Sequence, residues 1–408
     1  MHFLHIYFAF AAGYLLSYLY RTVNAVISPE LVRDLALNPS SLGLLTSAYF
    51  LAFAAMQVPV GMLLDRYGPR RVEPVLLAIA ATGAALFAYA ESLTGLALAR
   101  AVIGAGVCAC LMAPLKAIIT WYPPDRQASY AGWVMVAGGI GALAATVPLE
   151  LALRVMHWRV VFVGLSIVTL VVALAIWWRV PDIAKPAQSG GIKAQFAAVR
   201  TVVVHSRFWW IAPLAGFTMG SFMAIQGLWA VPWLMEVAGA TRASAANHLL
   251  AMNAVVMLGY AALGFFGTKL ARRGIHSRHL FAAGFALSVV ALALIVLELP
   301  GGYLWWSLYG LGAAVNVLGF TVLNEGFGRD MAGRTNTTLN LFMFALSFLS
   351  QWGIGVIVDL MRTMFGLDDA GGLRVAFTVI LVGDVAAYAW FAYGWKRHRF
   401  HASVGAIV

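Results

Sequence analysis

The feature that most constrains this chain is a set of long segments that contain no Asp, Glu, Lys or Arg. Five of them run over 35–64, 127–149, 208–235, 299–324 and 335–358. About 20 apolar residues suffice to cross the hydrocarbon core of a bilayer as an α-helix. Inside that core every backbone amide needs a partner within the protein, and a helix provides these partners within a single segment. The sequence therefore predicts an all-α membrane protein.

The composition argues against several other classes of protein. The chain is 62% hydrophobic and 11% charged, with a mean hydropathy of +0.85, which is far more apolar than an ordinary soluble domain. Its net charge of +11 would indicate a nucleic-acid partner in a soluble protein. In a membrane protein it is explained by basic residues that hold loops on the inner side. We therefore expect a lipid bilayer as the environment and no nucleic-acid partner.

Both cysteines, Cys108 and Cys110, lie two residues apart in an apolar segment. This spacing is not typical of a disulfide framework.

Charges, prolines and glycines divide the chain into twelve candidate membrane helices. The first has no Lys or Arg before Arg21, so we interpret it as a span and not as a cleaved signal peptide. The stretch 179–195 holds two prolines, a Gly-Gly pair and four charges, which is typical of a linker. It predicts two six-helix bundles, 1–179 and 207–408, joined by a cytoplasmic linker over 180–206. The candidate helices are 3–22, 41–64, 73–91, 95–120, 127–150, 158–179, 207–235, 243–268, 278–298, 302–325, 335–360 and 373–395.

Alternate loops differ in basic content, which predicts the orientation of the chain. If the N-terminus is cytoplasmic, the inner loops hold 18 Lys and Arg residues and the outer loops hold seven. Basic residues are enriched in cytoplasmic loops. We therefore predict that both termini are cytoplasmic.

The two halves also share a loop pattern. GMLLDRYGPRR starts at Gly61 after the second helix, and GTKLARRGIHSR starts at Gly267 after the eighth. Such a repeat indicates two pseudo-symmetric six-helix units. In the first copy, Gly61 would allow close helix contact and Gly68 a tight turn, and Asp65 could bind a helix N-terminus or an arginine. In the second copy Ala271 replaces the aspartate.

These motifs resemble those of the major facilitator superfamily of transporters. The loop from Gly61 to Arg71 is similar to the family's signature between helices 2 and 3, and LALARAVIGAG, from Leu96 to Gly106, is similar to its helix 4 motif. The resemblance implies alternating access in a bacterial inner membrane, with the loop acting as a latch between the halves. The alternative is that its basic residues only set topology. The latch residues would be Gly61, Asp65, Arg66, Gly68, Arg70 and Arg71.

Three pairs of soft side chains four residues apart suggest a metal cargo. Residues at this spacing share a helix face, and thioether, thiolate and imidazole groups favour Cu(I). The pairs on the seventh and eighth helices also resemble those of the CcoA-like bacterial copper importers. Copper uptake is therefore our first prediction for the cargo, with ordinary core packing as the alternative. The pairs are Cys108 with Met112, Met219 with Met223, and His248 with Met252.

A second prediction for the cargo is a small organic solute imported with protons, such as an organic anion, a riboflavin-like vitamin or an iron chelate. Lys116 could bind a carboxylate or phosphate, or its amine could instead reach the cytoplasmic interface. The polar residues expected near the cavity are Arg21, Asn24, Lys116, Gln226, Asn316 and Asn324.

Asp384, midway along the twelfth helix, could couple transport to protons or form a structural hydrogen bond.

An enzyme is not expected, because neither a Walker-type phosphate loop nor an HExxH run occurs. We expect no resident cofactor, a small-molecule or metal-ion substrate, and a monomer.

Overall fold

The computed structural model describes residues 2–122, 124–181, 192–325, 327 and 331–404. These residues form helices and no β-strand, which confirms the predicted fold class. The first half of the chain contains α1 (His2–Leu35), α2 (Pro39–Tyr67), α3 (Pro69–Tyr89), α4 (Leu93–Val107), α5 (Met112–Trp121), α6 (Pro124–Ala144), α7 (Val147–Leu153) and α8 (Trp158–Arg179).

The second half follows α9 (Ile192–Val204), a helix inside the predicted linker that packs against α16, α10 and α2. Its helices are α10 (Ser206–Ala224), α11 (Ala230–Pro232), α12 (Arg242–Arg272), α13 (Ser277–Val296), α14 (Gly302–Ala313), α15 (Leu318–Asn324), α16 (Ala332–Phe365) and α17 (Asp369–Val404). Short η segments connect some of them: η1 (Ile225–Trp229), η2 (Trp233–Val237) and η3 (Ala314–Val317).

Eleven spans in the described residues are long and apolar enough to cross a membrane. The first predicted helix lies in α1, which is 34 residues long but is not among these eleven. The multi-pass membrane location predicted from the sequence is confirmed. Which side faces the cytoplasm stays a prediction.

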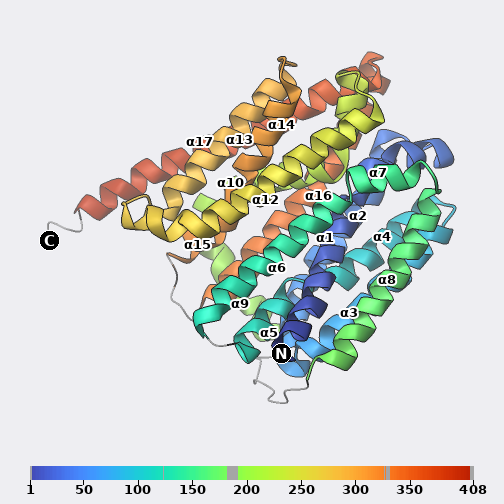
Figure 1. The fold of residues 1–408 in the computed structure, drawn as a ribbon. Coiled ribbons are helices and arrows are strands. Elements are labelled where there is room, and N and C mark those ends of the chain that lie inside the picture. The colour runs from blue at the N-terminus through green and yellow to red at the C-terminus, as the bar shows by residue number, and fades with distance from the viewer. Residues whose placement is uncertain (1, 123, 182–191, 326, 328–330, 405–408) are drawn as a thin grey trace.

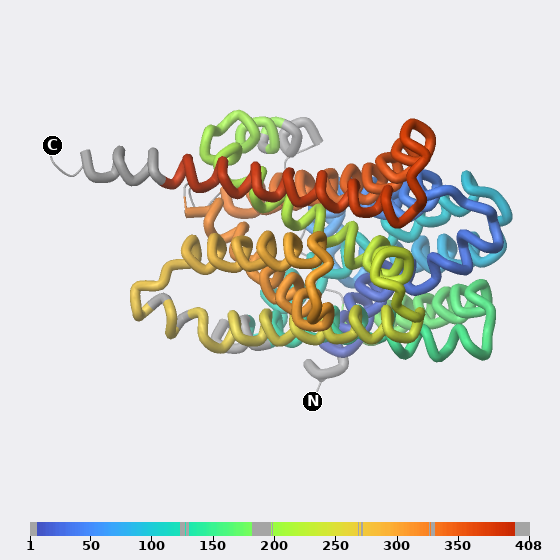
Figure 2. The backbone as a smooth tube through the Cα atoms, turned by 90° about the horizontal axis from the view of Figure 1, so that it is seen from above, coloured from blue at the N-terminus to red at the C-terminus, as the bar shows by residue number. Residues whose placement is uncertain are grey.

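The bundle has two ends, which differ in the chain segments that lie there. The linker side is the end where α8 finishes and α10 begins, and the far side is the end where α1 finishes and α12 begins. Figure 1 shows α6 and α12 diverging toward the linker side, and Figure 2 shows the long α17 along one edge of the second half. The helices α6 and α12 therefore lie closer together toward the far side than toward the linker side.

Four predicted helices are interrupted, which the sequence analysis did not anticipate. The fourth breaks at 108–111 between α4 and α5, and the fifth breaks at 145–146, just before Val147 and Pro148. The seventh contains the π-helical segments η1 and η2 around Pro232, and the tenth contains the 3₁₀ segment η3. Irregular backbone at membrane depth is tolerated where protein or a water-filled cavity surrounds it. Two of these interruptions, at 108–111 and at η3, lie beside the cavity described below.

Candidate functional site

A cavity of about 950 Å³ lies between the two halves. Its walls come from α1, α2, the α4–α5 break and α6 on one side, and from α10, α12, η3, α15 and α16 on the other. Along these helices the lining positions fall between the middle of the bundle and the linker side. Ligand sites in proteins are about 300–1,000 Å³, so a small organic molecule would fit.

Arg21 is the charged residue among the described side chains that line this cavity. Its guanidinium carbon lies 4.5 Å from the ring centre of Tyr18, 5.5 Å from that of Phe53 and 5.3 Å from that of Phe344. Because Phe344 belongs to α16, aromatic faces from both halves surround the charge.

The hydrogen bonding of Arg21 is incomplete. The guanidinium donates to the Tyr49 hydroxyl, whereas the buried Nε atom has no partner. Arg21 itself is 6% exposed. A buried cationic donor of this kind is costly unless a counter-charge binds to it. The cavity therefore presents an unpaired positive charge at the middle of the bundle.

Neutral polar groups surround this charge. Asn340 Nδ2 on α16 donates to Gln57 Oε1 on α2 at 2.8 Å, so one hydrogen bond crosses the cavity between the halves. The side chain of Asn316, on η3, has no partner for either its amide nitrogen or its oxygen. The hydroxyl-bearing residues Tyr14, Tyr18 and Tyr260 line the same space. This set can bind the hydroxyl groups of a polar organic ligand.

Sulfur atoms also line the cavity. Two of the three predicted pairs, Cys108 with Met112 and Met219 with Met223, lie in its wall. Met135, Met257 and Met343 join them, although the sequence analysis did not single these out. Beside the Arg21 charge, these side chains form adaptable apolar surface.

The third pair, His248 with Met252, does not line this cavity. His248 hydrogen-bonds through Nδ1 to the Ser244 carbonyl at 2.8 Å and stacks on the Tyr303 ring at 3.6 Å. Met252 is fully buried, and its side chain lies against Gly310. No cluster of three His, Cys, Asp or Glu side chains suited to a metal occurs among the described residues.

Four of the six polar residues predicted near the cavity bind elsewhere. Lys116 donates to Asp65 and, at 2.8 Å, to the Leu64 carbonyl, so its charge is paired, and it does not line the cavity. The others are fixed in a similar way, with Asn24 bound to Thr46 at 3.0 Å, Gln226 to Asn253, and Asn324 to Asn336 at 2.8 Å. Arg21 and Asn316 line the cavity.

The signature loop is held within the first half. Gly68 has a φ of +77° between α2 and α3, which explains the glycine there. Besides the Asp65–Lys116 pair, Arg70 Nε donates to the Trp177 carbonyl of α8, and Arg66 lies over the Tyr67 ring. Arg71 also has a partner. The predicted latch between the halves stays a prediction.

The close helix contact expected at Gly61 is not present. A Cβ added at Gly61 would meet no atom within 4 Å. Close contacts occur instead at the helix 4 motif, where a Cβ on Gly104 would lie 2.2 Å from the Tyr49 carbonyl oxygen and one on Gly106 would lie 2.4 Å from the Ala80 nitrogen. These two glycines let α4 pack directly on α2 and α3.

Contacts between the halves close the cavity on the far side. Arg242 at the start of α12 forms an ion pair with Glu30 of α1. The Ser40 backbone donates to Asp359 at 2.9 Å. This structure is therefore sealed on the far side.

Asp384 lies away from the cavity wall. It is 3% exposed, and its Oδ2 accepts a hydrogen bond from Ser221 at 2.8 Å, which joins α17 to α10. This contact fits the structural alternative that the sequence allows for it. Proton coupling through Asp384 is not tested by this arrangement.

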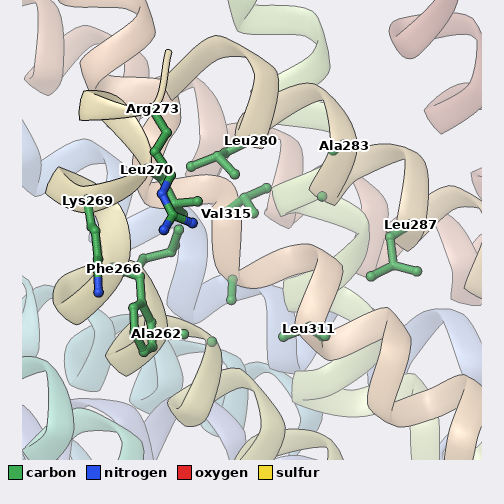
Figure 3. Close-up of a pocket in the computed structure, with 14 residues that line it drawn as sticks. Ala262, Phe266, Lys269, Leu270, Arg273, Leu280, Ala283, Leu287, Leu311 and Val315 are labelled. Carbon is green, nitrogen blue, oxygen red and sulfur yellow. The ribbon is translucent and has the colours of Figure 1, made fainter. Parts of the chain in front are cut away.

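A second cavity of about 580 Å³ lies within the second half, between α12, α13, α14 and η3. Figure 3 shows its mostly aliphatic wall, with Lys269 and Arg273 at one end. Because its walls come from one half only, relative movement of the halves would not open it alternately to the two sides. The cavity around Arg21 is the better candidate for cargo.

Gln57, Asn340 and Glu73 are polar residues near the site that the sequence analysis missed. Gln57 and Asn340 are amides inside the uncharged segments 35–64 and 335–358. A search for uncharged polar residues within membrane spans would have found both. Glu73 lies near the basic loop in sequence, which hid the fact that its side chain is fully buried.

The sequence of this chain is similar to one protein family and to several known transporters. The sequence matches the family described as the Major Facilitator Superfamily over residues 10–351. It is 31% identical over 164 residues to a hexuronate transporter of Escherichia coli, an alignment covering 40% of this chain and 38% of that one. It is 30% identical over 165 residues to a galacturonate transporter of Dickeya chrysanthemi, covering 40% and 47%. A probable sulfoacetate transporter of Cupriavidus necator is 30% identical over 158 residues, covering 38% and 36%.

The chain thus aligns with less than half of the length of each of these relatives. Solved structures match over almost the whole chain at lower identity. A bacterial homolog of the human lysosomal transporter Spinster has a TM-score of 0.74 at 19% identity, covering 95% of both chains. A nucleoside transporter also has a TM-score of 0.74, at 13% identity, covering 95% of this chain and 99% of that one. The match over residues 10–351, together with the shared fold, shows that this chain belongs to the Major Facilitator Superfamily.

Proposed function

We propose that this protein is a secondary transporter that imports a small organic anion, with an acidic sugar as the first candidate. The observation that carries the proposal is the unpaired Arg21 guanidinium in the cavity between the halves. A carboxylate that accepts hydrogen bonds from Arg21 would supply the missing counter-charge. Asn316 and the Gln57–Asn340 pair could bind the hydroxyl groups of the same molecule.

The relatives support the same class of cargo. Hexuronate, galacturonate and sulfoacetate are all small anions, and each is named for a relative about 30% identical to part of this chain. Import of Cu(I), our first prediction from the sequence, is supported less well. His248 and Met252 lie outside the cavity, and the Arg21 charge would repel a bound cation.

Uptake into proteoliposomes tests the proposal. Vesicles with and without the protein are supplied with labelled galacturonate or with Cu(I) held reduced. We expect protein-dependent uptake of galacturonate that unlabelled galacturonate competes away, and no protein-dependent uptake of Cu(I). Uptake of Cu(I) without uptake of galacturonate or another organic anion would reverse the assignment.

A further inference from the structure

Glu73 is a buried acid that the proposed binding of the anion does not use. It lies in the second turn of α3 and is 0% exposed. Neither carboxyl oxygen accepts a hydrogen bond from a nitrogen or oxygen atom, and the thiol of Cys110, a weak donor, lies beside them. A carboxylate removed from water without a partner is strongly unfavourable, so the group instead keeps a proton. In this state of the protein, Glu73 is therefore expected to be a neutral carboxylic acid.

The carboxyl group of Glu73 packs against α1, a helix that forms part of the cavity wall. A Cβ added at Gly13 of α1 would lie 2.5 Å from Glu73 Oε1, so the carboxyl occupies the space that this glycine leaves open. Gly13 adjoins Tyr14, which lines the cavity, and Arg21 lies two turns further along the same helix. A movement of α1 would therefore change the surroundings of both the acid and the guanidinium.

A second cavity element also meets Glu73. The thiol of Cys110, in the turn between α4 and α5, is the polar side chain that faces it. The same turn places Cys108 and Leu111 in the cavity wall. This irregular turn lacks the regular helical hydrogen bonding that makes its neighbours stiff. Glu73 thus lies between two elements of the cavity wall, α1 and the turn between α4 and α5. A movement of either element would change the surroundings of its carboxyl group.

Basic groups on the helices around α3 are occupied elsewhere. In the described part of the chain, none of them forms an ion pair with Glu73. On α3 itself, Arg70 and Arg71 have their own partners. The basic groups on the helices beside α3, at either end of it, and their partners are Arg21 with Tyr49, Arg100 with the Tyr20 carbonyl, Lys116 with Asp65, and Arg159 with the Ala88 and Ala90 carbonyls.

We propose that Glu73 is the proton-binding site that couples transport to a pH gradient, a proposal that rests on the anion transport proposed above. The proton leaves water on one side, forms an O–H bond with a Glu73 carboxylate oxygen, and is released to water on the other side after the halves move. A monovalent anion on Arg21 and a proton on Glu73 then cross together without net charge. This assigns coupling to α3 and not to Asp384 on α17.

Glutamine is the decisive substitution because it resembles a protonated glutamate in size and hydrogen bonding. With Glu73→Gln, the protein should fold and still exchange labelled for unlabelled galacturonate across vesicles at equal pH. Accumulation driven by a pH gradient should be lost. At one proton per anion, a gradient of about one pH unit drives about tenfold accumulation, so the expected change is from about tenfold to none. Glu73→Asp should retain part of the accumulation with a shifted pH profile.

Asp384→Asn is the matched control, since it removes a second buried carboxyl group that lies away from the cavity. It should keep accumulation that depends on the gradient. If Glu73→Gln accumulates galacturonate as the wild type does, or loses exchange together with accumulation while remaining folded, the coupling role is overturned.

An infrared measurement separates this proposal from the identity of the cargo. The purified protein at neutral pH should show carbonyl absorption of protonated carboxylic acids, with one component that is lost in Glu73→Gln and retained in Asp384→Asn. A band unchanged by Glu73→Gln would refute the proton site even if galacturonate proved to be the wrong anion. If the band behaves as expected while the wild type moves no organic anion, the proposed function fails and the proton site stands.

Discussion

Two membrane helices, α1 and α12, each carry a basic side chain in an apolar setting, and the structure treats them differently. On α1, Arg21 faces the cavity between the halves, and its Nε is buried without a partner. On α12, His248 is bound to the Ser244 carbonyl and covered by the Tyr303 ring within its own half. Both side chains are mostly buried, so burial alone does not distinguish them.

What distinguishes them is whether the side chain lines the cavity and has a hydrogen-bonding group without a partner. A buried polar group with its partners in place contributes to the fold, whereas one without a partner is ready for a ligand. Lys116 follows the pattern of His248, because Asp65 and the Leu64 carbonyl occupy its amine. The comparison predicts that a substitution reduces transport most where the residue has an unpaired hydrogen-bonding group at the cavity, and least where the partners of the residue are in place.

The largest effect is expected from Arg21→Ala. Removing one partner of a buried charged pair costs about 3–5 kcal/mol, and each 1.4 kcal/mol is about a factor of ten. Galacturonate uptake should therefore fall by about a hundredfold or more. Arg33→Ala, on the same helix but exposed and paired with Asp34, serves as the control and should keep uptake. Equal losses in both variants would break the comparison.

A smaller effect is expected where the halves meet on the far side. Glu30→Gln removes the ion pair with Arg242, which should let the far side open more often. Labelling of Cys108 in the cavity by an impermeant thiol reagent applied to the far side of oriented vesicles should become several-fold faster. Arg362→Gln breaks the pair with Asp369, which lies at the same end but within one half, and should leave the labelling rate unchanged.

His248→Phe combined with Met252→Leu should change transport by less than about twofold, because neither side chain lines the cavity. Loss of the hydrogen bond to Ser244 should lower the free energy of unfolding by about 1 kcal/mol. Uptake assays and thermal denaturation of the purified protein measure both quantities. A strong loss of uptake in a folded variant would restore this pair as a cargo site.

The smallest effect is expected at an exposed pair on the far side. Hydrogen bonding from Arg374 holds the pKa of Glu298 below its usual range. A carboxyl whose pKa is lower in the folded state stabilises the fold above its unfolded pKa, near 4.3, and loses this contribution as the pH falls through the folded value. The melting temperature of the wild type should therefore drop slightly more than that of Glu298→Gln on acidification from pH 6. Parallel curves would show that the pair contributes nothing.

The sequence alone predicts the fold well, because uncharged segments and loop charges are enforced by the membrane itself. It does not predict the interruptions at 108–111 and η3, since these depend on contacts between helices. It places Gly68 correctly at a turn but expects at Gly61 the close packing that the structure shows at Gly104 and Gly106. Which glycine is crowded depends on how the neighbouring helices cross.

The candidate site was predictable only in part for a similar reason. Helical spacing shows which residues share a face, but not whether that face meets the cavity or a neighbouring helix. Met219 and Met223 face the cavity, whereas His248 and Met252, with the same spacing, pack within the second half. The open hydrogen-bonding capacity of Arg21 becomes visible only when its neighbours are in place.

Equilibrium binding of a charged and an uncharged sugar tests the central claim most directly. Calorimetry on the purified protein should show galacturonate binding at least about tenfold more tightly than galactose, since the two differ chiefly in the carboxylate that Arg21 would bind. In Arg21→Gln this preference should disappear. Equal affinities for the two sugars in the wild type, or a preference that survives Arg21→Gln, would contradict the account.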